Sequence, residues 1–148
     1  MILYLDTSAL VKAYVEEAHS RDVLQGMNVA RASASHKVAY VEALAAFARL
    51  QRDHVLSEPE WEALKLGFTQ DWENYLQIDT TGPLLVHAAE LAEAFALRAY
   101  DSVHLAAAHI LRDQSEESVV FACYDRRLNQ AAELLGLNLL ETFSSDNL

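Results

Sequence analysis

Cysteine, proline and glycine are all scarce in this chain of 148 residues. A single cysteine, Cys123, excludes an intramolecular disulfide and any cysteine-based zinc site. It lies in the apolar run VVFAC, which indicates a small core residue rather than a nucleophile. With two prolines and four glycines, the chain has few interruptions. We therefore expect a helix-rich fold with short connections.

The chain also lacks a long hydrophobic run and a secretion signal. Its longest apolar stretches fall short of the roughly 18 residues that a membrane-spanning helix requires. The N-terminal sequence MILYLD has no basic segment and reaches Asp6 too early for a signal peptide. Hydrophobic residues make up 52% of the composition, which is enough for a buried core. We expect a cytoplasmic protein with one domain, residues 1–148.

Positive charge is in short supply as well. The sequence has 11 basic and 22 acidic residues, a formal net charge of −11. This balance opposes a nucleic-acid binder that works by charge alone, because such proteins are normally basic. It is compatible with a metal-dependent enzyme acting on phosphate, since acids at the site would be offset by bound cations.

Short apolar segments alternate with segments of helical periodicity, which predicts an α/β domain with a largely parallel sheet. The expected strands are 2–6, 29–33, 76–78, 119–123 and 137–140. The first expected helix starts at Thr7 and Ser8, which can cap it. Further helices are expected at 20–27, 36–54, 57–72, 82–97, 101–112 and 126–135. Ser57 and Glu60 form a capping box, and Gly136 ends the last helix.

Four acidic residues stand where apolar sequence changes to polar or helical sequence: Asp6, Glu42, Asp101 and Asp125. Asp6 and Asp125 follow buried strands, and the carboxyl ends of parallel strands share one edge of the sheet. A charge beside buried apolar residues is costly unless it is paired. A converging cluster of carboxylates would suit Mg²⁺ or Mn²⁺. Taken singly, three of these acids could be helix caps, and Glu42 could face solvent.

The four acids belong to longer motifs: YLDTSALVK at 4–12, VEALAA at 41–46, AYDSVHLAAA at 99–108 and FACYDRRLNQAAELLGL at 121–137. Together, in this order and spacing, they resemble the PIN-domain nucleases, and among them the VapC-type toxins of prokaryotic toxin–antitoxin pairs. The resemblance covers nearly the whole chain.

The resemblance implies a PIN-like α/β/α sandwich with about four to five strands and helices on both faces of the sheet. It implies a ribonuclease that hydrolyses RNA through metal-activated water, with Mg²⁺ or Mn²⁺ as cofactor. Asp6 and Asp101 match the principal metal ligands, Glu42 an acid that binds the metal or its waters, and Asp125 the least uniform fourth position. Ser8 matches a hydroxyl that completes the site. An antitoxin whose C-terminal segment blocks the acidic groove, and a homodimer without membrane attachment, are further implications.

Other polar and aromatic residues have plainer interpretations. Asn129 lies one helical turn after Asp125 and could reach the pocket or be an exposed helix residue. His104 follows Asp101 by three residues and could neighbour the site, yet His87, His104 and His109 lack metal-ligand spacing, which favours a packed or partly exposed helix position. An aromatic stripe, defined as Trp61, Phe68 and Trp72, favours core or subunit packing over base stacking. The candidate phosphate contacts, each more typical of a solvated surface, are Lys12, Arg49, Arg52, Arg98, Arg126 and Arg127.

Three other classes of protein share part of this pattern. A haloacid dehalogenase-type enzyme would have a D-x-D motif after the first strand, whereas this chain has Asp6-Thr7-Ser8. A receiver domain needs a pair of acids near that strand, which is absent. A PIN scaffold without catalytic activity, serving as a binding module, is the remaining alternative. The presence of all four acids favours the enzyme.

Overall fold

Residues 1–140, which the computed structural model describes, form seven helices and five strands in one sheet. All five strands run parallel, in the order β3-β2-β1-β4-β5. The strands are β1 Ile2–Leu5, β2 Ala32–His36, β3 Leu76–Ile78, β4 Val119–Ala122 and β5 Asn138–Leu139. The predicted α/β fold with a mainly parallel sheet is confirmed.

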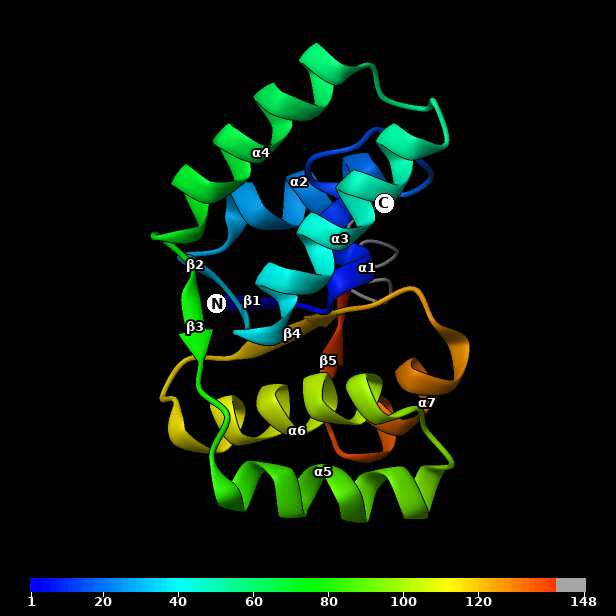
Figure 1. The fold of residues 1–148 in the computed structure, drawn as a ribbon. Coiled ribbons are helices and arrows are strands. Elements are labelled where there is room, and N and C mark those ends of the chain that lie inside the picture. The colour runs from blue at the N-terminus through cyan, green and yellow to red at the C-terminus, as the bar shows by residue number, and fades with distance from the viewer. Residues whose placement is uncertain (141–148) are drawn as a thin grey trace.

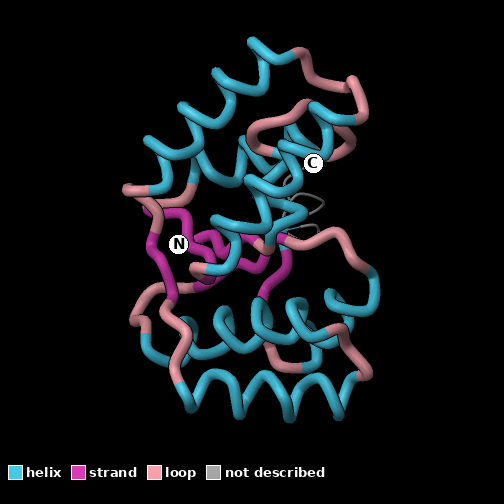
Figure 2. Tube along the Cα trace, viewed as in Figure 1, coloured by secondary structure: helices cyan, strands magenta, loops and turns pink. Residues whose placement is uncertain are grey.

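The helices cover both faces of the sheet. In Figure 1 the first four helices lie above the strands and the last three lie below them, and Figure 2 shows the strands between these two layers. The upper layer contains α1 Thr7–Lys12, α2 Ser20–Val29, α3 Val38–Arg52 and α4 Glu58–Trp72. The lower layer contains α5 Gly82–Phe95, α6 Ala99–Gln114 and α7 Arg126–Leu134. The molecule is therefore an α/β/α sandwich, as predicted.

The central strand β1 supplies side chains to two separate cores. Ile2 and Tyr4 pack into the cluster formed with α5, α6 and α7. Leu3 and Leu5 pack into the cluster formed with the upper helices. Successive side chains of a strand point to opposite faces, so a strand covered on both faces must be apolar at every position. This explains why ILYL is a continuous apolar run, and it places the following residue, Asp6, at the edge of both cores.

The strand expected at 29–33 is wrong in position. Val29 is the last residue of α2, and β2 covers Ala32–His36 instead. The sequence ASASH has no apolar run to mark it as a strand. It is held by parallel pairing with β1 on one side and β3 on the other, and Ser35 Oγ donates to the carbonyl of Leu5 at 2.7 Å. Tertiary pairing here overrides a weak local preference.

Helix boundaries show two further differences from the prediction. Asp6, rather than Thr7 or Ser8, caps α1, because its side chain accepts from the backbone amide of Ala9. Helix α6 begins at Ala99, so Asp101 lies in its first turn. Two other predicted boundaries are confirmed. Ser57 and Glu60 form both hydrogen bonds of the capping box of α4. Gly136 follows the C-cap of α7 with a φ of 83°.

The aromatic stripe on α4 lies in the core. Phe68 and Trp72 are buried in the upper cluster, and Trp61 packs against that cluster while partly buried. Phe68 also makes an edge-to-face contact with Phe47 of α3, with the ring centroids 5.6 Å apart. The core interpretation of the stripe is therefore confirmed, and the stripe gives no support to a subunit interface.

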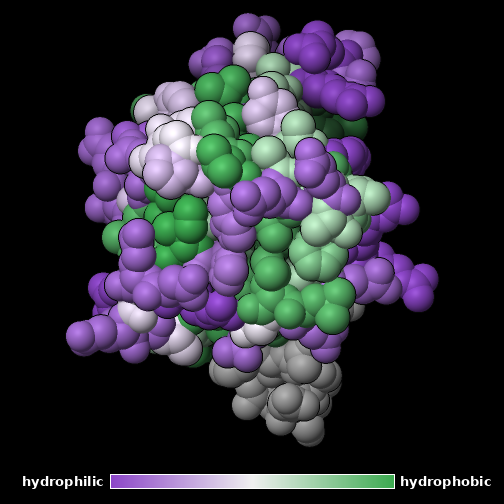
Figure 3. All heavy atoms as spheres, turned by 90° about the horizontal axis from the view of Figure 1, so that it is seen from below, coloured by the Kyte–Doolittle hydropathy of each residue, from purple (hydrophilic) through white to green (hydrophobic). Residues whose placement is uncertain are grey.

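The outer surface carries scattered apolar side chains. Seen from the side of α5, green apolar areas lie between purple polar ones (Figure 3), and Leu85 and Val86 of that helix are exposed. Within residues 1–140 there is no helix long and apolar enough to span a membrane.

Candidate active site

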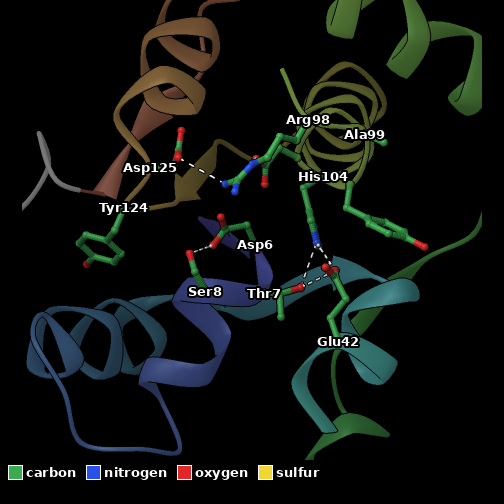
Figure 4. Close-up of a pocket in the computed structure, with 11 residues that line it drawn as sticks. Asp6, Thr7, Ser8, Glu42, Arg98, Ala99, His104, Tyr124 and Asp125 are labelled. Atoms are coloured by element: carbon green, nitrogen blue, oxygen red, sulfur yellow. Dashed lines mark hydrogen bonds and ion pairs between the residues drawn. The ribbon is translucent and has the colours of Figure 1, made fainter. Parts of the chain in front are cut away.

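The four acids predicted from the sequence come together at the carboxyl edge of the sheet. Strands β1 and β4 are paired in parallel, and the amide of Asp6 donates to the carbonyl of Ala122 at 3.1 Å. Asp6 follows β1 and Asp125 follows β4, so both reach the same edge. Glu42 comes from α3 and Asp101 from α6. All four line one pocket of about 530 Å³, together with Thr7, Ser8, Arg98, Ala99, Tyr100, His104 and Tyr124 (Figure 4).

Asp6 is the most deeply buried of the four acids, with 4% of its surface exposed. Its Oδ1 accepts from the hydroxyl of Ser8 and from the amide of Ala9, both at 2.9 Å. Burial raises the pKa of Asp6, while His104 and these two donors oppose the increase. The hydrogen bonds from Ser8 and Ala9 both use Oδ1. Asp6 therefore caps the helix through that oxygen and also lines the pocket. The predicted neighbour Ser8 lies in the same pocket.

Glu42 is held by two donors rather than facing solvent. Its Oε1 accepts from Thr7 Oγ1 at 2.7 Å and from His104 Nε2 at 3.0 Å. Burial raises the pKa of Glu42, but the hydrogen bonds from His104 and Thr7 outweigh burial and hold the pKa below its ordinary value. Glu42 therefore stays ionised in a partly desolvated position.

Asp101 and Asp125 share one cation, Arg98. The Nε of Arg98 donates to Asp101 Oδ2 at 2.9 Å, and its Nη2 lies 3.6 Å from Asp125 Oδ2. Asp125 also caps α7, because its Oδ1 accepts from the amide of Leu128. The two acids raise the pKa of the exposed guanidinium. Figure 4 shows Arg98 reaching across the pocket towards Asp125. A positive charge thus already lies between two of the acids.

Six basic residues were candidate phosphate contacts. Within the described part of the chain, Arg98 is the one of these six that lines the pocket. Lys12 lies near it, over the ring of Tyr124 at 5.3 Å from the centroid, and pairs with Glu17. Arg49 pairs with Asp53 at the far end of α3. Arg127 donates to the carbonyl of Ala96. The sequence offered no way to distinguish Arg98 from the others, because its role depends on the distance to two acids from different motifs.

His104 and Thr7 are parts of the pocket to which the sequence assigned no function. His104 is 2% exposed, so the packed position predicted for it is right, but its ring also bonds to Glu42. The available signal was its spacing: His104 lies three residues after Asp101, which puts both on one face of α6. Thr7 was expected only as a cap, and instead its hydroxyl bridges Glu42 and His104.

Asn129 and Cys123 lie behind the pocket rather than in it. Asn129 is 8% exposed, and its Nδ2 donates to the carbonyl of Cys123 at 2.8 Å, so it supports the connection between β4 and α7. The structure does not place it among the pocket-lining residues. The Cys123 thiol is buried, and desolvation raises its pKa strongly. Such a thiol is a poor nucleophile, which agrees with the core role expected for Cys123.

The pocket has the donor chemistry of a divalent-metal site. Carboxylates and a serine hydroxyl are hard oxygen donors of the kind that Mg²⁺ and Mn²⁺ prefer. As the side chains stand within residues 1–140, no three His, Cys, Asp or Glu groups are close enough to enclose a metal ion. Instead the guanidinium of Arg98 contacts two of the acids. The donor set is thus of the kind that a divalent ion prefers, while in this structure the guanidinium of Arg98 supplies the positive charge beside Asp101 and Asp125.

Comparison with known proteins identifies the family that the sequence motifs resemble. The family model described as "PIN domain" matches residues 3–134, and the chain belongs to this family. Within it the chain is of the VapC type, being 34% identical over 135 residues to ribonuclease VapC45 of Mycobacterium tuberculosis (strain CDC 1551 / Oshkosh), across 91% of this chain and 92% of that protein.

Solved structures share the fold at low sequence identity. The crystal structure of FitAcB from Neisseria gonorrhoeae matches with a TM-score of 0.65 and 17% identity, covering 94% of this chain and 96% of that one. VapBC2 from Rickettsia felis, bound to a DNA fragment from their promoter, matches with a TM-score of 0.63 and 14% identity, covering 94% and 97% of the two chains.

Proposed function

We propose that this protein is a Mg²⁺- or Mn²⁺-dependent endoribonuclease and the toxin of a type II toxin–antitoxin pair, acting in the cytoplasm. The observation that carries the proposal is the meeting of four carboxylates, from four separate motifs, in one pocket. Its relative VapC45 bears the name ribonuclease, which supports RNA as the substrate.

The chemistry of the pocket explains why acids would accumulate there. Four carboxylates in one pocket repel each other unless a cation compensates them. A divalent ion, when bound, would relieve this repulsion, lower the pKa of a bound water and stabilise negative charge on the phosphate. Asp6, Asp101, Glu42 and Asp125 would hold the ion, and Ser8 would orient Asp6. One of the carboxylates would accept the proton of the attacking water, so no nucleophilic side chain is required.

An Asp6→Asn variant tests the proposal. Asparagine keeps the size and the helix-capping ability of aspartate but removes the charge. We expect RNA cleavage to fall by about 100-fold or more and Mn²⁺ binding to weaken, as for the loss of a direct ligand. The matched control is Asp53→Asn, which removes one acid at the exposed end of α3. Equal cleavage and equal metal affinity in Asp6→Asn and wild type would refute metal-dependent catalysis at this pocket.

The alternative is a PIN-fold binding module without catalysis. The two functions differ in one measurement on the wild-type protein. A nuclease cleaves RNA when Mg²⁺ or Mn²⁺ is added and stops when the metal is chelated, whereas a binding module retains RNA or a protein partner without cleaving. The hydrogen bonds that keep Glu42 ionised favour the nuclease, because a binding module has no need of a desolvated carboxylate.

We also propose an antitoxin partner and a homodimer. The Rickettsia felis neighbour is VapBC2 bound to a DNA fragment from their promoter, which supports a partner protein for this chain. Addition of the cognate antitoxin should suppress RNA cleavage in a one-to-one titration. Light scattering on the purified chain should give twice the 16.5 kDa of a single copy, and a monomer mass would contradict the homodimer.

A further inference from the structure

A chain of hydrogen bonds runs from the buried sheet to the pocket through His104. Tyr4 of β1 is fully buried, and its hydroxyl lies 2.8 Å from His104 Nδ1. On the opposite side of the ring, Nε2 lies 3.0 Å from Glu42 Oε1 and 3.1 Å from Thr7 Oγ1. His104 therefore joins the central strand to two pocket residues on different elements (Figure 4).

The chemistry of Glu42 decides which ring nitrogen carries hydrogen. An ionised carboxylate only accepts, so the nitrogen facing it, Nε2, must be the donor. A neutral imidazole has a single N–H, which leaves Nδ1 as an acceptor. The hydroxyl of Tyr4 then donates to Nδ1. The same hydroxyl oxygen accepts from the amide of His36 at 3.1 Å, so the Tyr4 hydroxyl is both a donor and an acceptor.

Burial of Tyr4 keeps this arrangement in place. The Tyr4 hydroxyl is fully buried and has a partner on each side, His104 Nδ1 at 2.8 Å and the amide of His36 at 3.1 Å. Tyr4 belongs to the lower core, and His104 is 2% exposed at the inner wall of the pocket, so water has little access to either side chain. The hydrogen on Nε2 is thus directed at Glu42 by the fold itself.

We propose that His104 is a positioning residue for Glu42, oriented in turn by Tyr4. This inference rests on the proposed nuclease function. Both donors, Nε2 of His104 and the hydroxyl of Thr7, meet on Oε1 of Glu42, and Oε2 takes part in neither bond. Oε2 is then the oxygen presented to a divalent cation. Groups that orient a metal-binding carboxylate in this way are worth about 10- to 100-fold in metal affinity or activity.

This chain of hydrogen bonds from Tyr4 through His104 to Glu42, called the relay below, also links two acids that are far apart in the sequence. His104 and Asp101 lie on one face of α6, whereas Glu42 lies on α3. A bond from His104 to Glu42 sets the distance between the acid of α3 and the acid of α6. A histidine that served packing alone would need its contact with Tyr4, but it would not need a pocket carboxylate as its second partner.

Three variants separate positioning from packing. In His104→Leu the donor to Glu42 is lost, in His104→Gln a side-chain amide can replace Nε2–H, and in Tyr4→Phe the orienting hydroxyl alone is removed. Each is measured as the full chain for Mn²⁺ affinity, RNA cleavage (kcat and KM) and thermal unfolding. We expect His104→Leu to lose about 10- to 100-fold in kcat and to bind Mn²⁺ more weakly, with KM for RNA little changed.

Rescue is the decisive comparison. His104→Gln should recover most of the activity lost in His104→Leu, and Tyr4→Phe should lie between wild type and His104→Leu. If His104→Leu does not fold, the comparison of His104→Gln and Tyr4→Phe with wild type takes its place. Nitrogen NMR of the metal-free protein should find His104 as the Nε2–H tautomer, and an Nδ1–H ring would overturn the relay.

Failure of this inference can be told apart from failure of the proposed function. An active wild type with a folded His104→Leu of equal kcat and equal Mn²⁺ affinity would overturn the positioning role alone. Equal activity loss in the leucine and glutamine variants, in step with their unfolding temperatures, would reduce His104 to a packing residue. A wild type that neither binds Mn²⁺ nor cleaves RNA would refute the nuclease, and the positioning role would fall with it.

Discussion

Arg98 Nε donates to Asp101 Oδ2 at 2.9 Å, inside the pocket that the four acids share. The second contact of the guanidinium, with Asp125, makes Arg98 a competitor for any cation that these acids bind. The side chain is 79% exposed, so the competition is weak and can be displaced.

Removal of this internal cation should therefore strengthen metal binding. We predict that Arg98→Gln increases the affinity for Mn²⁺ by about two- to fivefold, the scale expected for exposed ion pairs. Calorimetric titration at low ionic strength measures the change. Arg49→Gln is the matched control, since it removes the same charge from the far end of α3. Equal affinities in the two variants would show that Arg98 does not compete.

Asp6 and Glu42 should affect the stability of the metal-free protein in opposite directions. Burial raises the pKa of Asp6, so the native state binds a proton more readily than the unfolded chain does. Stability then decreases as pH rises from the ordinary pKa of the carboxyl through its raised folded value. At pH 7, above the ordinary carboxyl pKa, burial of Asp6 is therefore destabilising, and we predict that Asp6→Asn unfolds at a higher temperature than wild type. The difference should shrink as pH falls below about 4.

Ionisation of Glu42 has the opposite effect on stability, because the pKa of Glu42 is lowered in the folded protein. Its contribution to stability is present above the ordinary carboxyl pKa and is lost as pH falls through the folded value. We predict that Glu42→Gln destabilises the protein at pH 7 by about 1 kcal/mol through weakened hydrogen bonds from His104 and Thr7. That corresponds to roughly 3 °C in Tm for a chain of this size. Melting curves of both variants from pH 4 to 8 check the two signs together.

The burial of the aromatic stripe of α4 predicts that two nearby residues of this helix differ greatly in how much stability is lost when each is replaced by alanine. Phe68 of α4 is fully buried against Phe47 of α3, whereas Leu66 of the same helix is 62% exposed. Phe68→Ala should cost about 3–5 kcal/mol of unfolding free energy, because it removes a ring and leaves a cavity. Leu66→Ala should change stability by less than about 0.5 kcal/mol. Urea denaturation measures both, and similar costs would place the stripe on the surface.

Two glycines should respond oppositely to alanine. Gly136 has a φ of 83°, and a Cβ there would lie 3.0 Å from Arg112 Nη1, so Gly136→Ala should destabilise by about 1–2 kcal/mol. Gly67 lies inside α4, and a Cβ there would meet nothing within 4 Å. Gly67→Ala should stabilise by about 0.5–1 kcal/mol through helix propensity. Thermal unfolding of the two variants side by side tests the assignment of Gly136 as the helix stop.

The parts of the fold that followed from the sequence are those with a strong local signal. The run ILYL, the capping box at Ser57 and the stop at Gly136 each depend on residues close together in the chain. The strand Ala32–His36 has no such signal, and its position comes from pairing with β1 and β3. At the start of α1 the sequence offered Thr7, Ser8 and Asp6 as caps, and it treated a cap and a site residue as alternatives for Asp6, whereas Asp6 is both.

For the candidate site, local sequence and the parallel-sheet rule were enough to bring Asp6 and Asp125 to one edge. Glu42 and Asp101 were added by resemblance to a family, and the structure places them in the same pocket. Asn129 was a candidate neighbour, and it supports the chain behind the pocket instead.

The sequence by itself determined which carboxylates are available and that a parallel α/β sheet would carry them, because periodicity and apolar runs are properties of neighbouring residues. Only the tertiary structure decided their partners: Arg98 between Asp101 and Asp125, and His104 between Tyr4 and Glu42. Hydrogen bonds and ion pairs act over about 3–4 Å. Residues as far apart in sequence as Tyr4 and His104 reach that distance only when β1 and α6 pack in one core.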